Sequence, residues 1–261
     1  TRSNPDSEIV DEAKKMGIDI KFSYVVIAAK GYKKVKSAEI AKISKDKKDL
    51  GQIENINCDC ICVSGFWTPT IHLASQSGNK TKFNKEIDAF IPSQSKQEET
   101  TVGSANGVFT LEETLKTSFE VGHELSKKIT NNDNKVSVPQ VTEKKSTQHD
   151  KFWCVPLPKG KKYKRFLDFQ NDVAVTDIEL ALREGYRSIE HVKRYTTLGM
   201  ATDQGKTSNL NGLQLVSNIE NKIIPEVGHT TFRPPYTPVT IGAIVGREVG
   251  KHSKPTRKSP M

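Results

Sequence analysis

The sequence predicts an α/β fold followed by a smaller, mostly α-helical unit. The first observation is an apolar run at 56–63 that ends in Ser64-Gly65 and precedes a helix-like segment at 70–77, an order typical of α/β proteins. The second is a polar stretch without periodicity at 130–150, which reads as a linker. The third is a series of short apolar segments with helix start and stop signals beyond residue 152.

The N-terminal part predicts one helix and two strands. Residues 5–16 form an amphipathic pattern, in which Pro5 suits a first helical turn and Gly17 suits a helix stop. The segments 18–29 and 35–43 are rich in β-branched residues and predict strands.

A loop is expected at 45–52, and the continuous apolar run at 56–63 then predicts a buried parallel strand. Its cysteines alternate, so a strand would place them on one face. No second pair with zinc-ligand spacing exists, and we interpret the cysteines as reduced, buried apolar side chains. The four cysteines of the chain are Cys58, Cys60, Cys62 and Cys154.

A second turn–helix unit is predicted at 101–128. Small residues precede a helix at 110–128, and Thr110 with Glu113 forms the pattern of a capping box. Small residues before a helix N-terminus allow a phosphate or a ribose to approach free backbone N–H groups. Such turns are also common before helices without any ligand, so a purely structural role is the alternative.

The C-terminal unit predicts three helices. A helix at 176–182 is expected to be capped by Thr176, with Glu179 completing the capping box and Gly185 ending the helix. Two further helices are expected at 188–195 and 208–218, each beginning at a serine. A Pro-rich loop follows, and then a short apolar segment at 241–245.

The charge favours a local anion site over a polyanion partner. The 261 residues carry 40 Lys and Arg against 31 Asp and Glu, a net charge of +9. Most of the basic residues are lysines scattered along the chain, which are typical of solvated faces. Apart from Arg2, every arginine lies at residue 165 or later, so we expect an anion site in the C-terminal part. No apolar run is long enough for a membrane-spanning helix, and the polar N-terminus does not resemble a signal peptide.

The densest group of polar residues lies at 194–212. Its cations, hydroxyls and glycines suit a phosphate or the polar edge of a ring. A nucleotide-hydrolysing P-loop is excluded, because Gly199 and Gly205 are one residue too far apart and no strand precedes them. The alternative is that these residues cap helices and brace turns. Arg233 and Tyr236, on a proline-stiffened loop nearby, favour binding.

The same residues carry a resemblance to a known family. The chain resembles the alpha subunit of heterotetrameric sarcosine oxidase in the segments FLDFQNDVAVTDIELALREGYRSIEHVKRYTTLGMATDQGKTSNLNG and IPEVGHTTFRPPYTPVTIGAIVGRE. Upstream, DCICVSGFWTPTIHLASQSGNKTKFN and VGSANGVFTLEETL look like two further segments of that family. The resemblance runs from about Cys58 to Arg247.

The resemblance implies a domain organisation. Residues 1–129 would be the C-terminal part of a disulfide-reductase-like FAD/NAD-binding α/β domain, and 130–151 a linker. Residues 152–249 would be a small helical domain, and 250–261 a linker toward an aminomethyltransferase-like folate domain. The chain would then be an internal fragment, without the G-x-G-x-x-G motif that opens the nucleotide-binding domain of this family.

The resemblance also implies a function. Such enzymes are cytoplasmic heterotetramers of alpha, beta, gamma and delta subunits that oxidatively demethylate sarcosine. The products are glycine, hydrogen peroxide, and formaldehyde or 5,10-methylenetetrahydrofolate. The alpha subunit holds NAD and contributes to an FMN site at the interface with the beta subunit, and the beta subunit carries FAD. The alternatives are a subunit of a flavoprotein amino-acid or opine dehydrogenase and, from another class, a basic nucleic-acid-binding protein.

Two sets of cofactor-binding residues follow from the resemblance, with no catalytic residue and no metal site, and the fragment alone is expected to be inactive. The set that would close over NAD is Gly103, Ser104, Ala105, Asn106, Gly107 and Thr110. The set that would face FMN and the beta subunit is Arg194, Thr197, Thr202, Gln204, Lys206, Thr207, Thr231 and Arg233.

Overall fold

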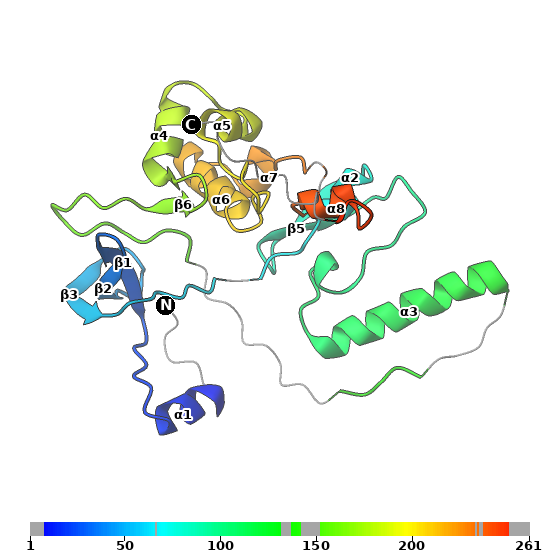
Figure 1. The fold of residues 1–261 in the computed structure, drawn as a ribbon, viewed down its shortest axis with the longest axis horizontal. Coiled ribbons are helices and arrows are strands. Elements are labelled where there is room, and N and C mark those ends of the chain that lie inside the picture. The colour runs from blue at the N-terminus through cyan, green and yellow to red at the C-terminus, as the bar shows by residue number, and fades with distance from the viewer. Residues whose placement is uncertain are drawn as a thin grey trace.

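A computed structural model describes residues 8–65, 67–131, 137–141, 152–232, 234 and 237–250. It combines a small antiparallel sheet near the N-terminus, a cluster of short helices in the C-terminal part, and a long helix, α3, that extends away from both (Figure 1). The expected mixture of strands and helices is confirmed. Among the described residues, no helix has the length and apolar character needed to cross a membrane.

The N-terminal elements are α1 (Glu8–Lys15), β1 (Tyr24–Gly31), β2 (Val35–Ile43) and β3 (Leu50–Asn57). The strands form one antiparallel sheet in the order β1-β2-β3, in which Ala38 of the central strand pairs with Ala29 on one side and Ile56 on the other. The helix expected at 5–16 is confirmed over Glu8–Lys15, and its expected first residues, 5–7, lie outside the described residues. The strand expected at 35–43 is confirmed, and the first strand begins later than expected.

The prediction of a buried parallel strand at 56–63 is wrong. The third strand ends at Asn57 and pairs antiparallel with β2, while residues 58–65 have no regular structure. The strands β2 and β3 are antiparallel because the turn between them, from Ser44 to Asp49, is short enough only for a hairpin. A parallel pair needs a crossover of a dozen or more residues. Val63 is 79% exposed, and the cysteines of this run are half-buried or exposed rather than buried.

The middle of the chain holds α2 (His72–Gln76), a hairpin of β4 (Thr81–Asn84) and β5 (Ala89–Pro92), a 3₁₀ turn (Gly103–Asn106) and α3 (Leu111–Thr130). Both helices predicted here are confirmed. Thr110 caps α3, because its hydroxyl oxygen accepts the backbone N–H of Glu113 and its hydroxyl donates to the Glu113 carboxylate. The hairpin was not predicted from the sequence.

The C-terminal helices surround a hydrophobic core. The elements are β6 (Phe166–Asp168), β7 (Val173–Ala174), α4 (Val175–Arg183), α5 (Ile189–Thr196), α6 (Asn209–Glu220), α7 (Ile224–Val227) and α8 (Ile241–Val245). The three predicted helices are confirmed as α4, α5 and α6. The core consists of Val173, Ile178, Ala181, Leu182, Ile189, Val192, Leu198, Leu213, Val216 and Ile224.

The predicted cap of α4 is wrong. The helix begins at Val175, so Thr176 lies inside the first turn. The carboxylate of Asp177 instead accepts the backbone N–H of Ala174 at 2.8 Å and satisfies one of the first free donors of the helix.

The hairpin of β4 and β5 packs on the C-terminal core although it precedes the linker in sequence. Phe83 and Phe90 contact the core, and their rings meet edge to face at a centroid distance of 5.3 Å. Thr81 Oγ1 lies 2.7 Å from His229 Nε2, and His229 Nδ1 donates to the Thr230 carbonyl at 2.9 Å. The hairpin therefore holds the segment after α7 in place.

Candidate functional site

A pocket of about 230 Å³ lies where α5, the loop between α5 and α6, and the segment after α7 meet. It contains three residues of the set that the resemblance assigns to FMN, namely Arg194, Gln204 and Thr231. Its lining residues are Glu190, Lys193, Arg194, Gly199, Met200, Ala201, Gln204, Thr231 and Phe232.

Asp168 anchors the loop of this pocket. Its side chain is buried, and one carboxylate oxygen accepts the backbone N–H groups of Gln170 and Asn171 at 2.9 and 3.2 Å. The other oxygen accepts the backbone N–H of Gly199 at 2.8 Å. The carboxylate fixes a turn, as short polar residues at a domain start commonly do, and it holds the first glycine of the pocket.

Asn209 determines how closely the loop folds on itself. Its buried amide lies against Gly199 and Gly205, where an added Cβ would approach the amide to 2.0 and 2.3 Å. Both glycines have positive φ angles, 67° and 72°, so glycine is required for the backbone as well as for space. The Asn209 amide also donates to Thr230 Oγ1 at 3.1 Å, which brings the segment after α7 to the loop.

Three threonines of the predicted set brace the loop and do not line the pocket. Thr202 donates to Gln170 Oε1 at 2.8 Å, and Thr207 donates to an Asp203 carboxylate oxygen at 2.7 Å. The Thr197 hydroxyl donates to the preceding carbonyl at 2.6 Å. In the described structure these hydroxyls stabilise turns, which is the alternative role that the sequence analysis gave for them.

The lining carries two cations and one carboxylate. Arg194 is exposed, and its guanidinium lies 3.9 Å from the carboxylate of Glu190 one helical turn earlier. Glu190 also accepts the backbone N–H of Thr231 at 2.8 Å, so this acid is held by the pocket wall. Lys193 adds the second positive charge. The two cations outnumber the one carboxylate, so the charge of the lining favours an anionic group.

Phe232, which lines the pocket, contacts a histidine ring, and sequence reasoning missed this contact. The ring of Phe232 contacts that of His72, with centroids 3.8 Å apart. His72 is buried, and this burial, with the nearby positive charge of Lys206, lowers its pKa to about 4. The imidazole is therefore neutral at pH 7. No sequence signal marks this pair, because His72 and Phe232 lie far apart along the chain.

The turn predicted to close over NAD contributes nothing to this pocket. Gly103 is buried. A Cβ at Gly107 would lie 2.7 Å from Ile87 and 3.0 Å from Ile91, so packing explains Gly107. The N–H of Gly107 donates to the carbonyl of Ser104. Two glutamates, Glu112 and Glu113, occupy the first turn of α3 and oppose a phosphate there.

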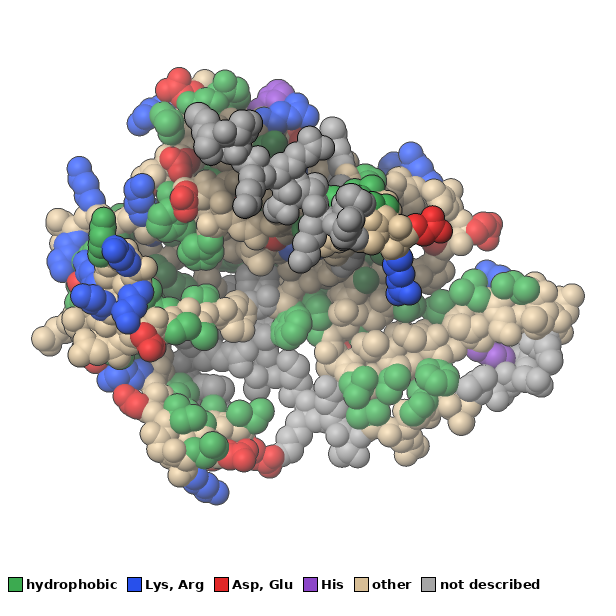
Figure 2. Space-filling view, viewed as in Figure 1, with side chains coloured by type: hydrophobic (Ala, Val, Ile, Leu, Met, Phe, Trp, Pro, Cys, Tyr) green, Lys and Arg blue, Asp and Glu red, His purple; other side chains and the backbone are tan. Residues whose placement is uncertain are grey.

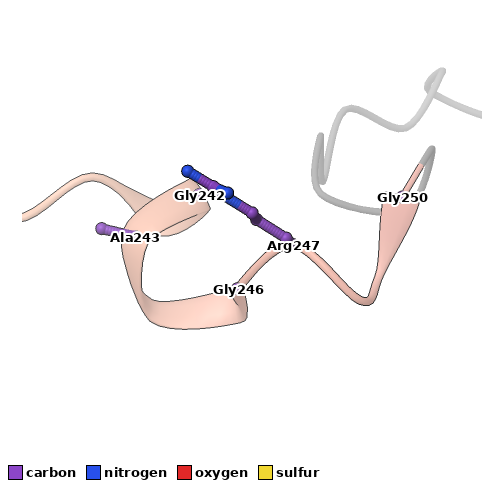
Figure 3. Close-up of a pocket in the computed structure, with 5 residues that line it drawn as sticks. All are labelled: Gly242, Ala243, Gly246, Arg247 and Gly250. Atoms are coloured by element: carbon purple, nitrogen blue, oxygen red, sulfur yellow. The ribbon is translucent and has the colours of Figure 1, made fainter.

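A second pocket, of about 490 Å³, lies along α8 (Figure 3). Gly242, Ala243, Gly246, Arg247 and Gly250 line it, and the Arg247 side chain points back toward Gly242. Among the described residues, no group of three or more His, Cys, Asp and Glu side chains is arranged to hold a metal ion. The predicted Arg233 and the neighbouring Tyr236 lie outside the described residues.

The chain is similar to known proteins over most of its length. Residues 162–247 match the family model described as the Sarcosine oxidase A3 domain. The chain is 36% identical over 260 residues to the Sarcosine oxidase subunit alpha of Rhizobium meliloti (strain 1021), covering 97% of this chain and 25% of the relative. It is 33% identical over 229 residues to that of Corynebacterium sp. (strain P-1), covering 85% of this chain and 23% of the relative. The chain thus spans about a quarter of the curated relatives.

A solved structure shares the fold. The crystal structure of L-proline dehydrogenase from P. horikoshii is similar, with a TM-score of 0.61 and 20% sequence identity. The likeness covers 91% of this chain and 47% of that one.

Proposed function

Because this chain is a relative of the sarcosine oxidase alpha subunit and carries the A3 domain of that family, we propose that it forms part of a flavin-binding subunit of a sarcosine-oxidising enzyme. Its role is to supply cofactor-binding and interface surface, while the residues that oxidise the amine lie outside this segment. The observation that carries the proposal is the pocket that unites Arg194, Gln204 and Thr231 from three separate segments.

The chemistry of the pocket fits the phosphate end of FMN. Arg194 and Lys193 supply cations for the phosphate, and Gln204 and Thr231 supply hydrogen-bonding groups for the ribityl chain. Phe232 supplies an apolar surface. When bound, FMN contributes the transfer of electrons to oxygen.

The size of the pocket supports an interface site. Its volume of about 230 Å³ lies below the roughly 300–1,000 Å³ of pockets that enclose a whole ligand. This pocket holds part of FMN, and a partner chain, the beta subunit in our proposal, covers the remainder.

The Gly103 turn is proposed to contact NAD through ribose hydroxyls and not through the pyrophosphate. Carboxylates accept hydrogen bonds from hydroxyls but repel phosphate, and Glu112 and Glu113 stand at the start of α3. This part of the proposal is separate from the FMN pocket, because the two sets of residues do not share a cavity.

The proposed assembly is a heterotetramer with beta, gamma and delta subunits, in which the beta subunit holds FAD. The proposed reaction is the oxidative demethylation of sarcosine to glycine. It yields hydrogen peroxide, with formaldehyde or 5,10-methylenetetrahydrofolate as the one-carbon product.

The test is retention of FMN by the assembled enzyme. The full-length subunit that contains this segment is produced with its partner subunits, and FMN is measured by fluorescence after denaturation. Arg194→Ala removes one charge-assisted contact, so FMN binding weakens by about tenfold to a hundredfold. Arg187→Ala is the matched control, because Arg187 pairs with Glu220 away from the pocket and its loss leaves FMN content unchanged.

Unchanged FMN content in the Arg194→Ala enzyme would overturn the assignment of the pocket. The reaction is tested separately, by measuring peroxide with sarcosine in the unaltered enzyme. If sarcosine yields no peroxide while an artificial electron acceptor is reduced, the enzyme is a dehydrogenase of a related kind and the oxidase proposal fails.

A further inference from the structure

Cys60 and Cys62 lie side by side on the surface, and not in the buried strand that was expected at 56–63. Both thiols are exposed, and their sulfur atoms are 3.8 Å apart. They belong to the irregular stretch after β3. The last hydrogen bond to the sheet is the one that the backbone N–H of Cys58 donates to the Lys36 carbonyl. Cys58 is therefore held against the sheet, whereas Cys60 and Cys62 are not.

The backbone between the two cysteines permits a disulfide. Even a fully extended chain places the Cα atoms of residues i and i+2 only about 6.6 Å apart, within the range of roughly 4.4–6.8 Å seen across disulfides, and a bent chain brings them closer. The sulfur atoms must move from 3.8 Å to bonding distance, and rotation of the side chains with a small backbone shift achieves this. Because no ladder hydrogen bond holds residues 60–62, this shift costs little.

We propose that Cys60 and Cys62 form a reversible disulfide by exchange with a low-molecular-weight disulfide. One thiolate attacks a sulfur of the small disulfide, which forms a mixed disulfide and releases one small thiol. The second protein thiolate then attacks the protein sulfur of the mixed disulfide and releases the second small thiol. Two protein thiols are oxidised, one small disulfide is reduced to two thiols, and the two protein protons pass to the leaving thiolates or to water.

The bond is expected to be easily reduced. A disulfide that spans a single intervening residue closes a very small ring, and strained or exposed disulfides are the labile ones. The neighbouring Cys62 also raises the pKa of the Cys60 thiol above its ordinary value of 9.0, first through a hydrogen bond and then through its charge. Because the thiolate is the attacking species, exchange should accelerate as the pH rises toward 9.

The sequence offers a direct test, because Asp59 lies between Cys58 and the proposed pair. The full chain is incubated with oxidised glutathione, the remaining thiols are alkylated, and the chain is cleaved on the amino side of Asp59. We expect the fragment that begins at Asp59 to be two hydrogen atoms lighter and unalkylated, while Cys58 is alkylated on a separate fragment. Fragments that remain joined across Asp59, or a persistent glutathione adduct on the unaltered chain, would overturn the proposal.

Matched variants separate the pair from its neighbour. Cys62→Ser should stop the reaction at a glutathione adduct on Cys60, and Cys58→Ser should leave disulfide formation unchanged. Millimolar reduced glutathione should restore both thiols of the oxidised chain. A disulfide that resists this reduction contradicts reversibility, and loss of the disulfide in the Cys58→Ser chain contradicts the choice of partners. None of these outcomes depends on FMN, so the proposed function is tested separately.

Discussion

His72 makes the stability of the fold depend on pH. Its imidazole has an ordinary pKa of 6.5 in the unfolded chain and a pKa of about 4 in the folded one, chiefly because it is buried. Between these values the unfolded chain binds a proton that the folded chain does not, so stability falls as the pH drops from about 6.5 to about 4. Denaturation by urea across this range should show the loss, and His72→Gln should flatten it. The exposed His191 provides the control variant His191→Gln, in which the loss should persist.

Asp168 is expected to be essential for the loop that builds the pocket. In Asp168→Asn, an N–H₂ group replaces an acceptor that faces backbone N–H groups, so the free energy of unfolding should fall by about 2 kcal/mol. The urea midpoint at constant slope measures this change. Asp172→Asn is the control, because Asp172 is exposed with a φ of 54°, a conformation that asparagine also tolerates. Equal losses in the two variants would contradict the anchoring role.

At the residue scale, the sequence pointed to some residues of the pocket but not to its geometry, and anion binding there stays a prediction. Arg194 and Gln204 belong to the polar group at 194–212 that the sequence predicts to suit an anion, and Thr231 was named only through the family resemblance. All three line one pocket. Phe232 and His72 could not be found in this way, because an isolated aromatic residue and an isolated histidine carry no spacing that predicts their contact. The sequence marked Asn209 only as one polar residue among several, and did not predict that three segments meet at its amide.

Two helical glycines provide a matched test at the scale of elements. In α6, a Cβ at Gly212 would lie 2.4 Å from the buried Leu198, so Gly212→Ala should lower the free energy of unfolding by about 1–3 kcal/mol through overpacking. In α3, nothing lies within 4 Å of a Cβ at Gly122, so Gly122→Ala should raise helix stability by about 0.5–1 kcal/mol. Urea denaturation measures the first change, and far-ultraviolet circular dichroism the second. An unchanged free energy of unfolding in Gly212→Ala would show that α6 and Leu198 are not packed as described.

Helices were predicted more reliably than strands because their signals are local. Thr110 with Glu113 marks the start of α3 within four residues of sequence. The direction of a strand depends on its partner, and the apolar run at 56–63 carries no information about the hairpin turn that makes β3 antiparallel. Even a local signal can be misplaced by two residues, as at α4, where the N-cap is Ala174 and not Thr176, and Asp177 supplies the capping carboxylate.

Across the whole molecule, protection from hydrogen exchange should be uneven. The helices α4, α5 and α6 share the main core, whereas α1 and α3 contain no buried residue. Figure 2 shows hydrophobic side chains along the surface of α3, where Leu111, Leu125 and Ile129 are exposed. Backbone amides of α4 and α6 should therefore exchange slowest, and those of α1 and α3 fastest among these helices. Exchange followed by mass spectrometry tests this order, and strong protection of α3 in the isolated chain would contradict it.

The contact between Thr81 and His229 spans 148 residues of chain, which constrains how the protein folds during synthesis. At roughly 5–20 residues per second, the ribosome needs about 7–30 s to add this length. Throughout that interval the hairpin has emerged with Phe83 and Phe90 but has no helical core to cover them. The nascent chain therefore carries an exposed aromatic hairpin for seconds before its partner exists, and this is the stage at which we expect it to bind chaperones.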